Sequence, residues 1–363
     1  MLNETLYTIP IGFDKETNVY GVIMLEEKYI MKKFINDPNK VVDEMLEGLL
    51  LAHSDKLKSV REDNRSLTRR SSPTKNKVGI VTGGGSGHLP LFLGYVGEGM
   101  LDGVAVGDVF QSPSARQILD TIKAVDGGAG VLALYGNYGG DVMNFGMATD
   151  LADMEEIKVE NVVATDDVAS YPKGGEDKRR GVAGMFFIYK VAAAKAEKFA
   201  TLEEVKDIAI KANNNVRTMG VALTPCTLPA VGKPTFQIKD GEMELGIGIH
   251  GEPGIKTGKI ETADIVAEKI ITSILEDLDI PAGSEVAVLI NGLGSTPLEE
   301  QYIIYRKVYK VLEEKSVKIY RNYIGEYATS FEMVGLSISV FKLNDEFIEL
   351  LDEPFETPFF IQK

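Results

Sequence analysis

Three short runs of β-branched and apolar residues each end at a turn rich in glycine or aspartate, and this pattern limits the fold more than any other feature. The runs lie at residues 77–82, 130–135 and 159–164. Segments of helical length, with apolar residues at helical spacing, accompany them at 41–53 and 202–214. Strands that alternate with helices form parallel sheets, whose ligand crevice lies at the carboxyl ends of the strands. The sequence therefore predicts an α/β protein with a site at these three turns.

A second set of strand and helix patterns follows residue 215. Strand patterns lie at 218–223, 242–250, 286–291, 317–320 and 337–343, and helix patterns at 262–278 and 298–314. We therefore expect two α/β domains, which a length of 363 residues accommodates. The first, 31–215, is expected to be a three-layer sandwich with a largely parallel sheet, and the second, 216–363, a smaller α/β domain. Residues 1–30 form an extension, either before a native start at Met31 or as an added strand.

Charge and cysteine content exclude several classes of protein. The chain carries 54 acidic and 39 basic residues, a net charge of −15, and so lacks the basic face that follows a phosphate backbone. The single cysteine, Cys226, excludes an internal disulfide and a cysteine-rich zinc site. No signal peptide and no run of about 18 apolar residues is present. We expect a cytoplasmic protein that binds neither nucleic acid nor membrane.

Only three histidines are present, and two of them lie in glycine-rich turns. His88 ends the segment Thr-Gly-Gly-Gly-Ser-Gly-His, where glycines let the backbone approach a ligand. The segment lacks both the lysine of a phosphate loop and the spacing of the dinucleotide fingerprint. His250 lies in Gly-Ile-Gly-Ile-His-Gly-Glu-Pro-Gly, on a predicted strand whose glycines leave room beside the ring. We interpret both as functional, the alternative for His250 being a core histidine bonded to a carbonyl.

The remaining histidine and the carboxylates complete the candidates. His53 ends a predicted helix, and we interpret it as structural. No histidine pair has the spacing of metal ligands, so we expect no metal. Asp141 follows Gly-Asn-Tyr-Gly-Gly and would begin a helix, as an N-cap, as an acid or base, or as both. Three further segments are left open between turns and functional roles: Asp166–Asp167, Arg179–Arg180 and 325–330. We interpret Asn291-Gly-Leu-Gly as a turn, the alternative being a role in lining the crevice.

Five motifs, in this order, resemble the K subunit of dihydroxyacetone kinases. They are Gly-Gly-Gly-Ser-Gly-His-Leu-Pro at 83–90, Asn-Tyr-Gly-Gly-Asp at 137–141, Arg-Arg-Gly-Val-Ala at 179–183, Gly-Ile-His-Gly-Glu-Pro-Gly at 248–254 and Asn-Gly-Leu-Gly at 291–294. The resemblance extends over about residues 31–358. It implies that a ring nitrogen of His250 adds to a substrate ketone and forms a hemiaminal. It further implies that His88 is the base for the attacking hydroxyl and Asp141 an acid and base. Substrate oxygens would be held by the backbone around Gly85, Ser86 and Gly87.

The same resemblance implies partners. In one layout of the family, a nucleotide-binding helical domain is fused to this unit and uses ATP. In the other, the domain is a separate L-type subunit whose ADP and Mg are recharged by a phosphotransferase protein. Because this chain has no phosphate loop, we expect it to bind no cofactor itself and to act with a nucleotide-binding partner. The family also implies a homodimer. The alternative is a ketone-sensing coactivator of a transcription regulator, without kinase turnover.

Three departures from the family pattern bear on the substrate. Gly136 stands where a substrate-contacting lysine is common, Leu89 where glutamate is usual, and Gln-Ser-Pro-Ser at 111–114 where a Thr-Ser-Pro-Thr type of run is usual. Loss of the lysine removes a donor and is expected to open space in the pocket. These features resemble the erythrulose kinase branch of the family. We therefore expect a small ketose, either dihydroxyacetone or the four-carbon erythrulose.

Overall fold

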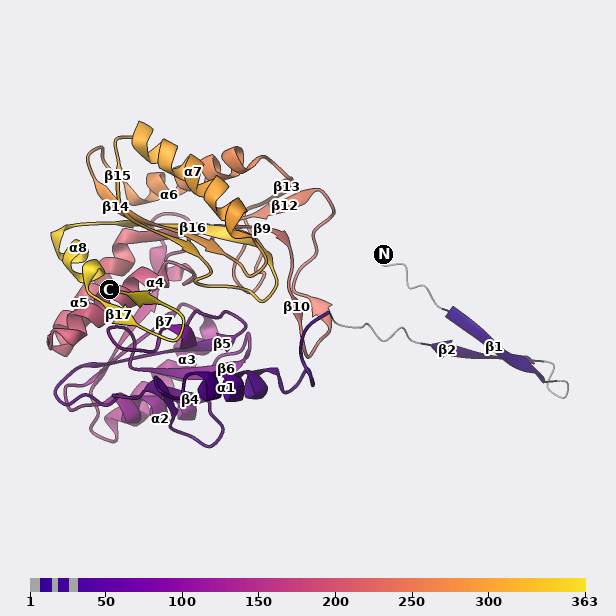
Figure 1. Cartoon of the computed structure of the whole chain (residues 1–363), viewed down its shortest axis with the longest axis horizontal. Coiled ribbons are helices and arrows are strands. Elements are labelled where there is room, and N and C mark those ends of the chain that lie inside the picture. The colour runs from indigo at the N-terminus through magenta and orange to yellow at the C-terminus, as the bar shows by residue number, and fades with distance from the viewer. Residues whose placement is uncertain (1–6, 15–18, 26–31) are drawn as a thin grey trace.

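The computed structural model of the chain describes residues 7–14, 19–25 and 32–363 (Figure 1). Within residues 32–363, two six-stranded sheets are stacked with helices between them and further helices on both outer faces. The strands β1 (Tyr7–Asp14) and β2 (Val19–Leu25) pair as an antiparallel hairpin. The prediction for residues 1–30 was an extension, either before a native start at Met31 or as an added strand. It concerns this hairpin together with residues 1–6, 15–18 and 26–31, which lie outside the described residues.

The first sheet is largely parallel, as predicted, and has the order β3-β4-β6-β5-β7-β8. Its parallel strands are β6 (Gly103–Val109), β5 (Gly79–Ser86), β7 (Val131–Gly136) and β8 (Val159–Ala164). The short strands β3 (Leu57–Ser59) and β4 (Ser66–Arg69) are added in antiparallel orientation at one edge. The three strands inferred from the sequence are therefore neighbours, and their carboxyl ends meet at one edge of the sheet.

Helices cover both faces of this sheet. The helices α2 (Ala115–Val125) and α3 (Gly139–Asp153) pack on one face. The helices α1 (Val41–Ala52), α4 (Met185–Glu197) and α5 (Leu202–Asn215) pack on the other. Helix α4 is buried on nearly all sides, which explains why its sequence is apolar all round rather than amphipathic.

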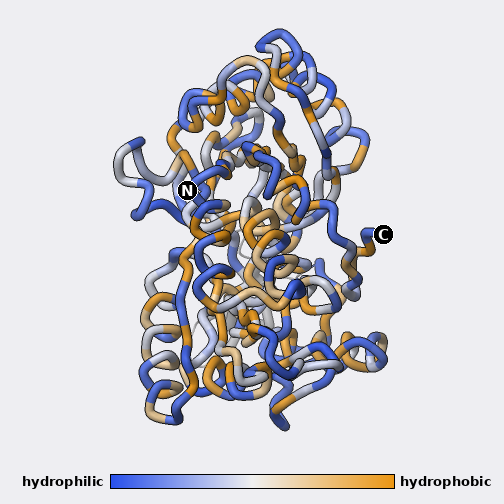
Figure 2. The backbone as a smooth tube through the Cα atoms, turned by 90° about the vertical axis from the view of Figure 1, so that its left-hand side faces the viewer, coloured by the Kyte–Doolittle hydropathy of each residue, from blue (hydrophilic) through white to orange (hydrophobic). Residues whose placement is uncertain are grey.

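The second sheet is mixed and has the order β13-β12-β9-β16-β14-β15. Its strands are β9 (Val216–Thr224), β12 (Glu242–Leu245), β13 (Lys256–Lys259), β14 (Glu285–Gly292), β15 (Lys318–Gly325) and β16 (Val334–Lys342), of which only β14 and β15 pair in parallel. The helices α6 (Ala263–Leu278) and α7 (Leu298–Glu314) cover its outer face. Both are amphipathic, and Figure 2 shows hydrophilic and hydrophobic residues alternating along the outer helices.

The two sheets share one core. Along β14, Val286 and Val288 face α6 and α7, whereas Ala287 and Leu289 belong to the same cluster as α4 and the first sheet. This alternation follows from the two-residue period of a strand. The chain passes from α5 to β9 between residues 215 and 216. The division into two domains at that position stays a prediction.

One strand prediction was wrong in a way that matters for the site. The strand expected at 242–250 ends at Leu245, because Gly246 has φ of +81° and turns the chain. His250 therefore lies in a loop and not on a strand. The other elements are short: α8 (Asp345–Asp352), the 3-10 helices η1 (Leu93–Tyr95) and η2 (Glu176–Lys178), and the strands β10 (Thr227–Leu228), β11 (Lys233–Pro234), β17 (Phe355–Glu356) and β18 (Ile361–Gln362). None of the described helices is long and apolar enough to cross a membrane.

Candidate active site

His88 follows the end of β5 and is almost completely buried. Gly87, just before it, has φ of +105°, and a Cβ there would lie 2.6 Å from the Phe331 ring and 2.7 Å from the Phe110 ring. Only glycine satisfies both the backbone and this crowding. The turn therefore carries the histidine ring to the carboxyl-terminal edge of the sheet, as the sequence predicted.

A backbone carbonyl determines which nitrogen of His88 carries the proton. Nδ1 lies 2.7 Å from the Thr329 oxygen. Because a carbonyl can only accept, Nδ1 donates and the neutral ring keeps a lone pair on Nε2. Nε2 is buried and has no hydrogen-bond partner among the described residues. Burial and the charge of His250 lower the pKa of His88 to about 3, so the ring is neutral near pH 7.

His250 presents the complementary arrangement from the second sheet. Its Nδ1 lies 2.9 Å from Glu252 Oε1, and its backbone N–H donates to Glu252 Oε2 at 2.9 Å. The carboxylate keeps the ring proton on Nδ1, and no hydrogen bond among the described residues engages Nε2. The side chain is 23% exposed, so an incoming ligand can reach it.

Glu252 is ionised because its neighbours outweigh its burial. Burial raises the pKa of Glu252, but the His250 hydrogen bond and the charges of His250 and Arg180 bring it down to about 2. The Arg180 guanidinium also binds Asp167 at 2.8 Å. Gly248 makes this possible, since a Cβ there would overlap both Glu252 Oε2 and Arg180 Nη1.

The two histidine rings meet in an aromatic enclosure. Their centroids are 4.7 Å apart and the rings are nearly perpendicular, at 79°. Phe110 stacks on His88 at 4.7 Å and meets the edge of His250 at 5.1 Å. Tyr138 lies 4.8 Å from His250 and donates from its hydroxyl to the Gly181 carbonyl. The structure thus brings together two histidines that are separated by more than 160 positions in the sequence.

The sequence analysis missed the phenylalanines that shape this enclosure. Phe92, Phe110 and Phe331 all adopt left-handed backbone conformations, with φ of 65°, 55° and 48°. Such conformations are rare for bulky residues and concentrate at functional sites. Phe110 stands next to the Gln-Ser-Pro-Ser segment, but nothing in its sequence pattern indicated contact with His88. Tyr138 lay within a quoted motif without being given a role.

Asp141 lies in the first turn of α3 but is not its N-cap. The N-cap position is Tyr138, and no side chain there accepts a capping hydrogen bond. Asp141 is the third residue of the helix, is 4% exposed, and its Oδ1 has no partner among the described residues. Burial raises the pKa of Asp141 to about 6, although Ser112 and the charge of His250 oppose the shift. A carboxyl group with this pKa can give or take a proton near neutral pH.

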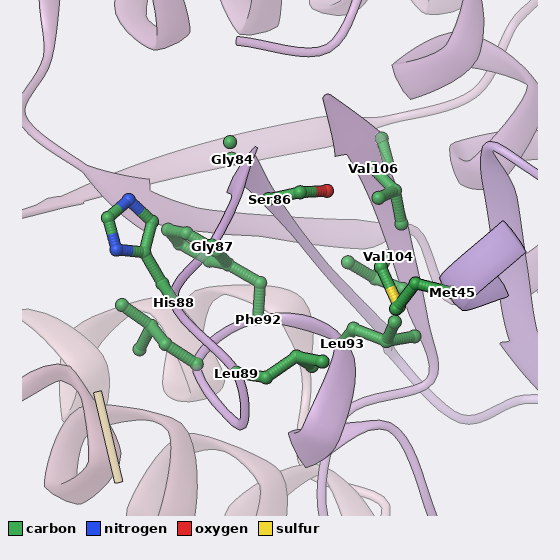
Figure 3. A pocket seen from close by; sticks show the side chains of 13 residues that line it. Met45, Gly84, Ser86, Gly87, His88, Leu89, Phe92, Leu93, Val104 and Val106 are labelled. Atoms are coloured by element: carbon green, nitrogen blue, oxygen red, sulfur yellow. The ribbon is translucent and has the colours of Figure 1, made fainter. Parts of the chain in front are cut away.

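The glycine-rich segment before His88 is tightly packed. A Cβ on Gly85 would lie 2.7 Å from the Gln111 backbone nitrogen. Ser86 donates its hydroxyl to the Gly107 carbonyl at 2.8 Å. Figure 3 shows the cavity beside this segment, with the His88 ring turned away from the apolar side chains of Met45 and Val104. Its volume of about 20 Å³ holds little more than one water molecule, so it is not the ketose site.

Several candidates from the sequence have structural partners. Arg179 is fully buried and bidentate to Asp277, at 2.9 and 2.6 Å, which leaves it no part in binding phosphate. Asp166 accepts from the Val182 and Gly184 backbone nitrogens before α4. His53 ends α1, away from the enclosure. Among the residues that the structure describes, no three histidine, cysteine or acidic side chains converge as metal ligands.

The expected space at Gly136 is filled in this structure. A Cβ on Gly136 would lie 3.0 Å from Tyr138 Cε2 and 3.4 Å from the Gly181 oxygen. The Tyr138 ring, which also faces His250, therefore occupies the position next to this glycine.

Comparison with known proteins identifies relatives along nearly the whole chain. The Dak1 domain model matches residues 47–359. The chain is 47% identical over 330 residues to the dihydroxyacetone-binding subunit DhaK of PTS-dependent dihydroxyacetone kinase 2 from Listeria innocua, covering 91% of this chain and 99% of that protein. It is 40% identical over 334 residues to the L-erythrulose kinase of Pectobacterium atrosepticum, covering 91% of this chain and 56% of that protein.

Solved structures agree with these matches. The dihydroxyacetone kinase of C. freundii superimposes with a TM-score of 0.83 at 32% identity, covering 92% of this chain and 61% of that one. The dihydroxyacetone kinase operon co-activator Dha-DhaQ superimposes with a TM-score of 0.81 at 31% identity, covering 86% and 96%. These similarities confirm the fold class and the family resemblance inferred from the five motifs. The chain belongs to the Dak1 domain family.

Proposed function

We propose that the chain is the ketose-binding subunit of a dihydroxyacetone-type kinase and holds its substrate as a hemiaminal on His250. The observation that carries the proposal is the state of the His250 ring. Its proton is held on Nδ1 by Glu252, its Nε2 is unengaged among the described residues, and its side chain is partly exposed. An imidazole nitrogen with a directed lone pair is a nucleophile for a carbonyl carbon.

Residues at the site account for the electrons, the proton and the charge in the addition of His250 to the ketone. The Nε2 lone pair of His250 forms a bond to the ketone carbon, and the carbonyl π electrons move to oxygen. Asp141 gives that oxygen a proton, which its raised pKa of about 6 allows near neutral pH. The ring becomes positively charged, and the Glu252 carboxylate stabilises it. The reverse step releases the ketose. A polyol such as glycerol has no carbonyl and cannot be held in this way.

His88 would then act on the hydroxyl that attacks phosphorus. Its unpartnered Nε2 lies in a ring 4.7 Å from His250, so it can accept a hydrogen bond from a hydroxyl of the bound ketose. The low pKa of His88 applies to the protein without a bound substrate or phosphoryl donor. Negative charge on an approaching phosphoryl group raises the pKa of a neighbouring base, which favours proton transfer to Nε2. Gly85, Ser86 and Gly87 would hold the remaining substrate oxygens through their backbone.

The phosphoryl donor would come from a partner. We propose a separate nucleotide-binding L-type subunit that carries ADP or ATP with Mg, and a homodimer of the present chain in the cytoplasm. The relative from Listeria innocua, which this chain matches over 99% of that protein's length, is named as a dihydroxyacetone-binding subunit. The single cysteine is buried, in keeping with a reducing compartment.

The substrate is dihydroxyacetone or erythrulose. The names of the relatives include both kinds of kinase. Because the Tyr138 ring fills the position beside Gly136, the extra carbon of erythrulose would have to lie elsewhere along the exposed side of His250.

A second function is favoured by one specific observation. The operon co-activator Dha-DhaQ superimposes on this chain over 96% of its own length. A coactivator could bind the same ketone on His250 without any phosphoryl transfer.

Turnover with a partner separates the two functions. The chain is mixed with a nucleotide-binding subunit of a dihydroxyacetone kinase and with either MgATP or the phosphotransferase protein that recharges that subunit. Dihydroxyacetone, D-erythrulose, L-erythrulose or glycerol is then added. Phosphorylated ketose is measured by mass spectrometry. We expect one ketose to be phosphorylated, glycerol to be inert, and each protein alone to be inactive. Binding of ketones without any phosphorylated product would favour the coactivator.

A further inference from the structure

We infer that Asn291, at the end of β14, is a positioning residue for His88. It holds the segment at 327–329 in the place where the Thr329 carbonyl keeps the His88 proton on Nδ1. The sequence predicts a turn at the Asn-Gly-Leu-Gly motif that begins at Asn291, and the proposed mechanism does not use this motif. The hydrogen bonds are independent of any activity, whereas the expected effect on turnover rests on the proposed function.

The Asn291 side chain is fully buried and completely satisfied. Its Oδ1 accepts from the backbone nitrogens of Tyr327 and Ala328, both at 2.8 Å. Its Nδ2 donates to the Ala328 carbonyl at 2.8 Å and to Ser337 Oγ at 3.0 Å. A carboxamide has two donors and two acceptor lone pairs, so all four are in use. Three of the four bonds fix the backbone of a segment that lies between β15 and β16 and has no ladder partner of its own.

The next residue along this segment contacts the histidine turn of the first sheet. The Thr329 backbone nitrogen donates to the His88 carbonyl at 3.2 Å, and its Oγ1 donates to the Leu89 carbonyl at 2.8 Å. The Thr329 carbonyl receives the bond from His88 Nδ1. Phe331 N–H donates to the Gly87 carbonyl at 2.9 Å. The tautomer of a histidine in the first sheet is therefore set by a segment that Asn291 holds in the second.

The position of one proton decides what His88 can do. While the Thr329 carbonyl accepts from Nδ1, Nε2 has a free lone pair and can take a proton. If the carbonyl moves away, the proton is free to occupy Nε2, which then becomes a donor and cannot act as a base. A purely structural asparagine would change stability but would leave this proton in place.

Nitrogen-15 NMR of the histidine rings measures the tautomer directly. The chain has only three histidines, so its long-range proton–nitrogen spectrum is simple, and a His53→Gln variant assists assignment. In the unaltered chain near pH 7, we expect His88 to be protonated on Nδ1 alone. In Asn291→Ala, we expect both His88 nitrogens to move to intermediate shifts, as in a mixture of tautomers.

Three further variants serve as matched controls. Ser337→Ala removes the one Asn291 bond that does not reach the segment, and Thr329→Ala keeps the carbonyl. Ser339 lies in the same strand as Ser337, and Ser339→Ala removes the buried hydrogen bond that Ser339 accepts from Thr218. We expect all three to keep the Nδ1 tautomer. Asn291→Ser offers a smaller change if Asn291→Ala fails to fold.

The outcomes for Asn291 and for the proposed function are distinct. A folded Asn291→Ala or Asn291→Ser chain with the unaltered tautomer overturns the inference, as does an unaltered chain that carries the His88 proton on Nε2. With a nucleotide-binding subunit, we expect Asn291→Ala to lower kcat by about 100-fold, the lower range for a general base, with KM for the ketose changed less than about threefold. Absence of any ketone adduct in the unaltered chain would contradict the proposed function and leave the tautomer result standing.

Discussion

The reactivity of His250 depends on the charge of one neighbouring carboxylate. Glu252 binds both the ring and the backbone nitrogen of His250, and its pKa of about 2 keeps it ionised near neutral pH. In the proposed mechanism it fixes the nucleophilic nitrogen and stabilises the positive ring that the addition creates.

Replacement of Glu252 by glutamine separates these two effects. Glu252→Gln retains an oxygen that can accept from Nδ1 but loses the charge, so we expect the adduct with dihydroxyacetone to weaken by about 10- to 100-fold, as one to two pKa units of lost charge stabilisation would give. Glu244→Gln is the matched control, because Glu244 binds the same loop at the Gly254 nitrogen without contacting His250. Titration of the adduct by carbon-13 NMR measures both. Equal adduct formation in Glu252→Gln and the unaltered chain would contradict the role of the charge.

Asp141 makes the protein less stable at high pH than it would otherwise be. Its pKa rises from 3.8 to about 6 on folding, mainly through burial. Below pH 3.8 the group is protonated in the folded and unfolded chains alike. As pH rises through 6 the folded chain must ionise a buried carboxyl, and the stabilising effect of the neutral form is lost.

Asparagine at this position mimics the neutral form at every pH. We expect Asp141→Asn to unfold with a free energy about 2–3 kcal/mol larger than the unaltered chain at pH 8, and with nearly the same free energy at pH 4, from about two pKa units at 1.36 kcal/mol each. Urea unfolding at the two pH values tests this. A variant that is less stable than the unaltered chain at pH 8 would show that the buried carboxylate is well solvated or paired. Turnover should fall at least about 100-fold.

At the scale of elements, the loop that follows β12, and not the strand itself, positions His250 and Glu252. Gly248 has an ordinary backbone conformation, but a Cβ there would overlap the ends of the Glu252 and Arg180 side chains. Because both are long side chains that can rotate away, the substitution should disturb the carboxylate without unfolding the chain.

Gly248→Ala is therefore expected to separate stability from adduct formation. Its free energy of unfolding should change by less than about 1 kcal/mol, whereas the adduct on His250 should weaken by at least about tenfold, because the carboxylate leaves Nδ1. Gly258→Ala, in β13 with open surroundings, is the control. Urea unfolding and the carbon-13 titration provide the two readouts. Loss of the fold, or an unchanged adduct, would contradict this account of the loop.

The sequence predicted those elements that carry their own signal. The strands β5, β7 and β8 have β-branched runs that end in glycine or aspartate, and α7 has clear amphipathic spacing. The bounds of β7, β8 and α7 were predicted to within one residue, whereas β5 continues to Ser86, through three of the glycines that were expected to form the turn. The Val-Ala-Val-Gly-Asp run of β6 carries the same signal and was missed, whereas the short strand β4 forms through its pairing with β6. The length of β12 was overestimated, since the positive φ of Gly246 is a property of the folded chain.

The same distinction applies to the site. His88, Asp141 and His250 could be proposed from the sequence because each lies in or directly after a glycine-rich segment, which leaves few side chains around it. Thr329 could not, because its contact with His88 joins positions 241 residues apart. The phenylalanines of the enclosure gave no signal for the same reason.

At the scale of the whole molecule, the site lies where the two sheets meet, and one helix leads from it to the surface. Helix α3 begins beside Tyr138 and holds Asp141 in its first turn. Its outer face carries the exposed apolar side chains Met143, Met147 and Leu151 at helical spacing, and the exposed Met154 follows directly after the helix. Flexible methionines are common at protein-binding surfaces. We expect the proposed nucleotide-binding subunit to cover this end of α3 when it delivers a phosphoryl group to the ketose.

We expect Met143→Glu combined with Met147→Glu to reduce partner-dependent turnover by at least about tenfold, because charges would enter an apolar contact. Adduct formation on His250 should be unchanged, since neither side chain contacts the ring. Tyr302→Glu combined with Ile303→Glu, on the exposed side of α7, provides a control of similar chemistry. Turnover at increasing partner concentration is the measurement. Equal loss in both double variants would point away from α3, and a changed sedimentation coefficient of the chain alone would assign the face to a second copy.

The central claim is the covalent bond between His250 and a ketone, and carbon-13 NMR tests it most directly. The chain is mixed with dihydroxyacetone labelled at the carbonyl carbon, and the experiment is repeated with each erythrulose enantiomer and with His250→Gln. We predict that the carbonyl resonance of one ketose is replaced by that of a carbon bonded to four other atoms, coupled to a labelled His250 ring nitrogen, and that His250→Gln abolishes it. A carbonyl that remains intact with all three ketoses, or an adduct that persists in His250→Gln, would contradict the account.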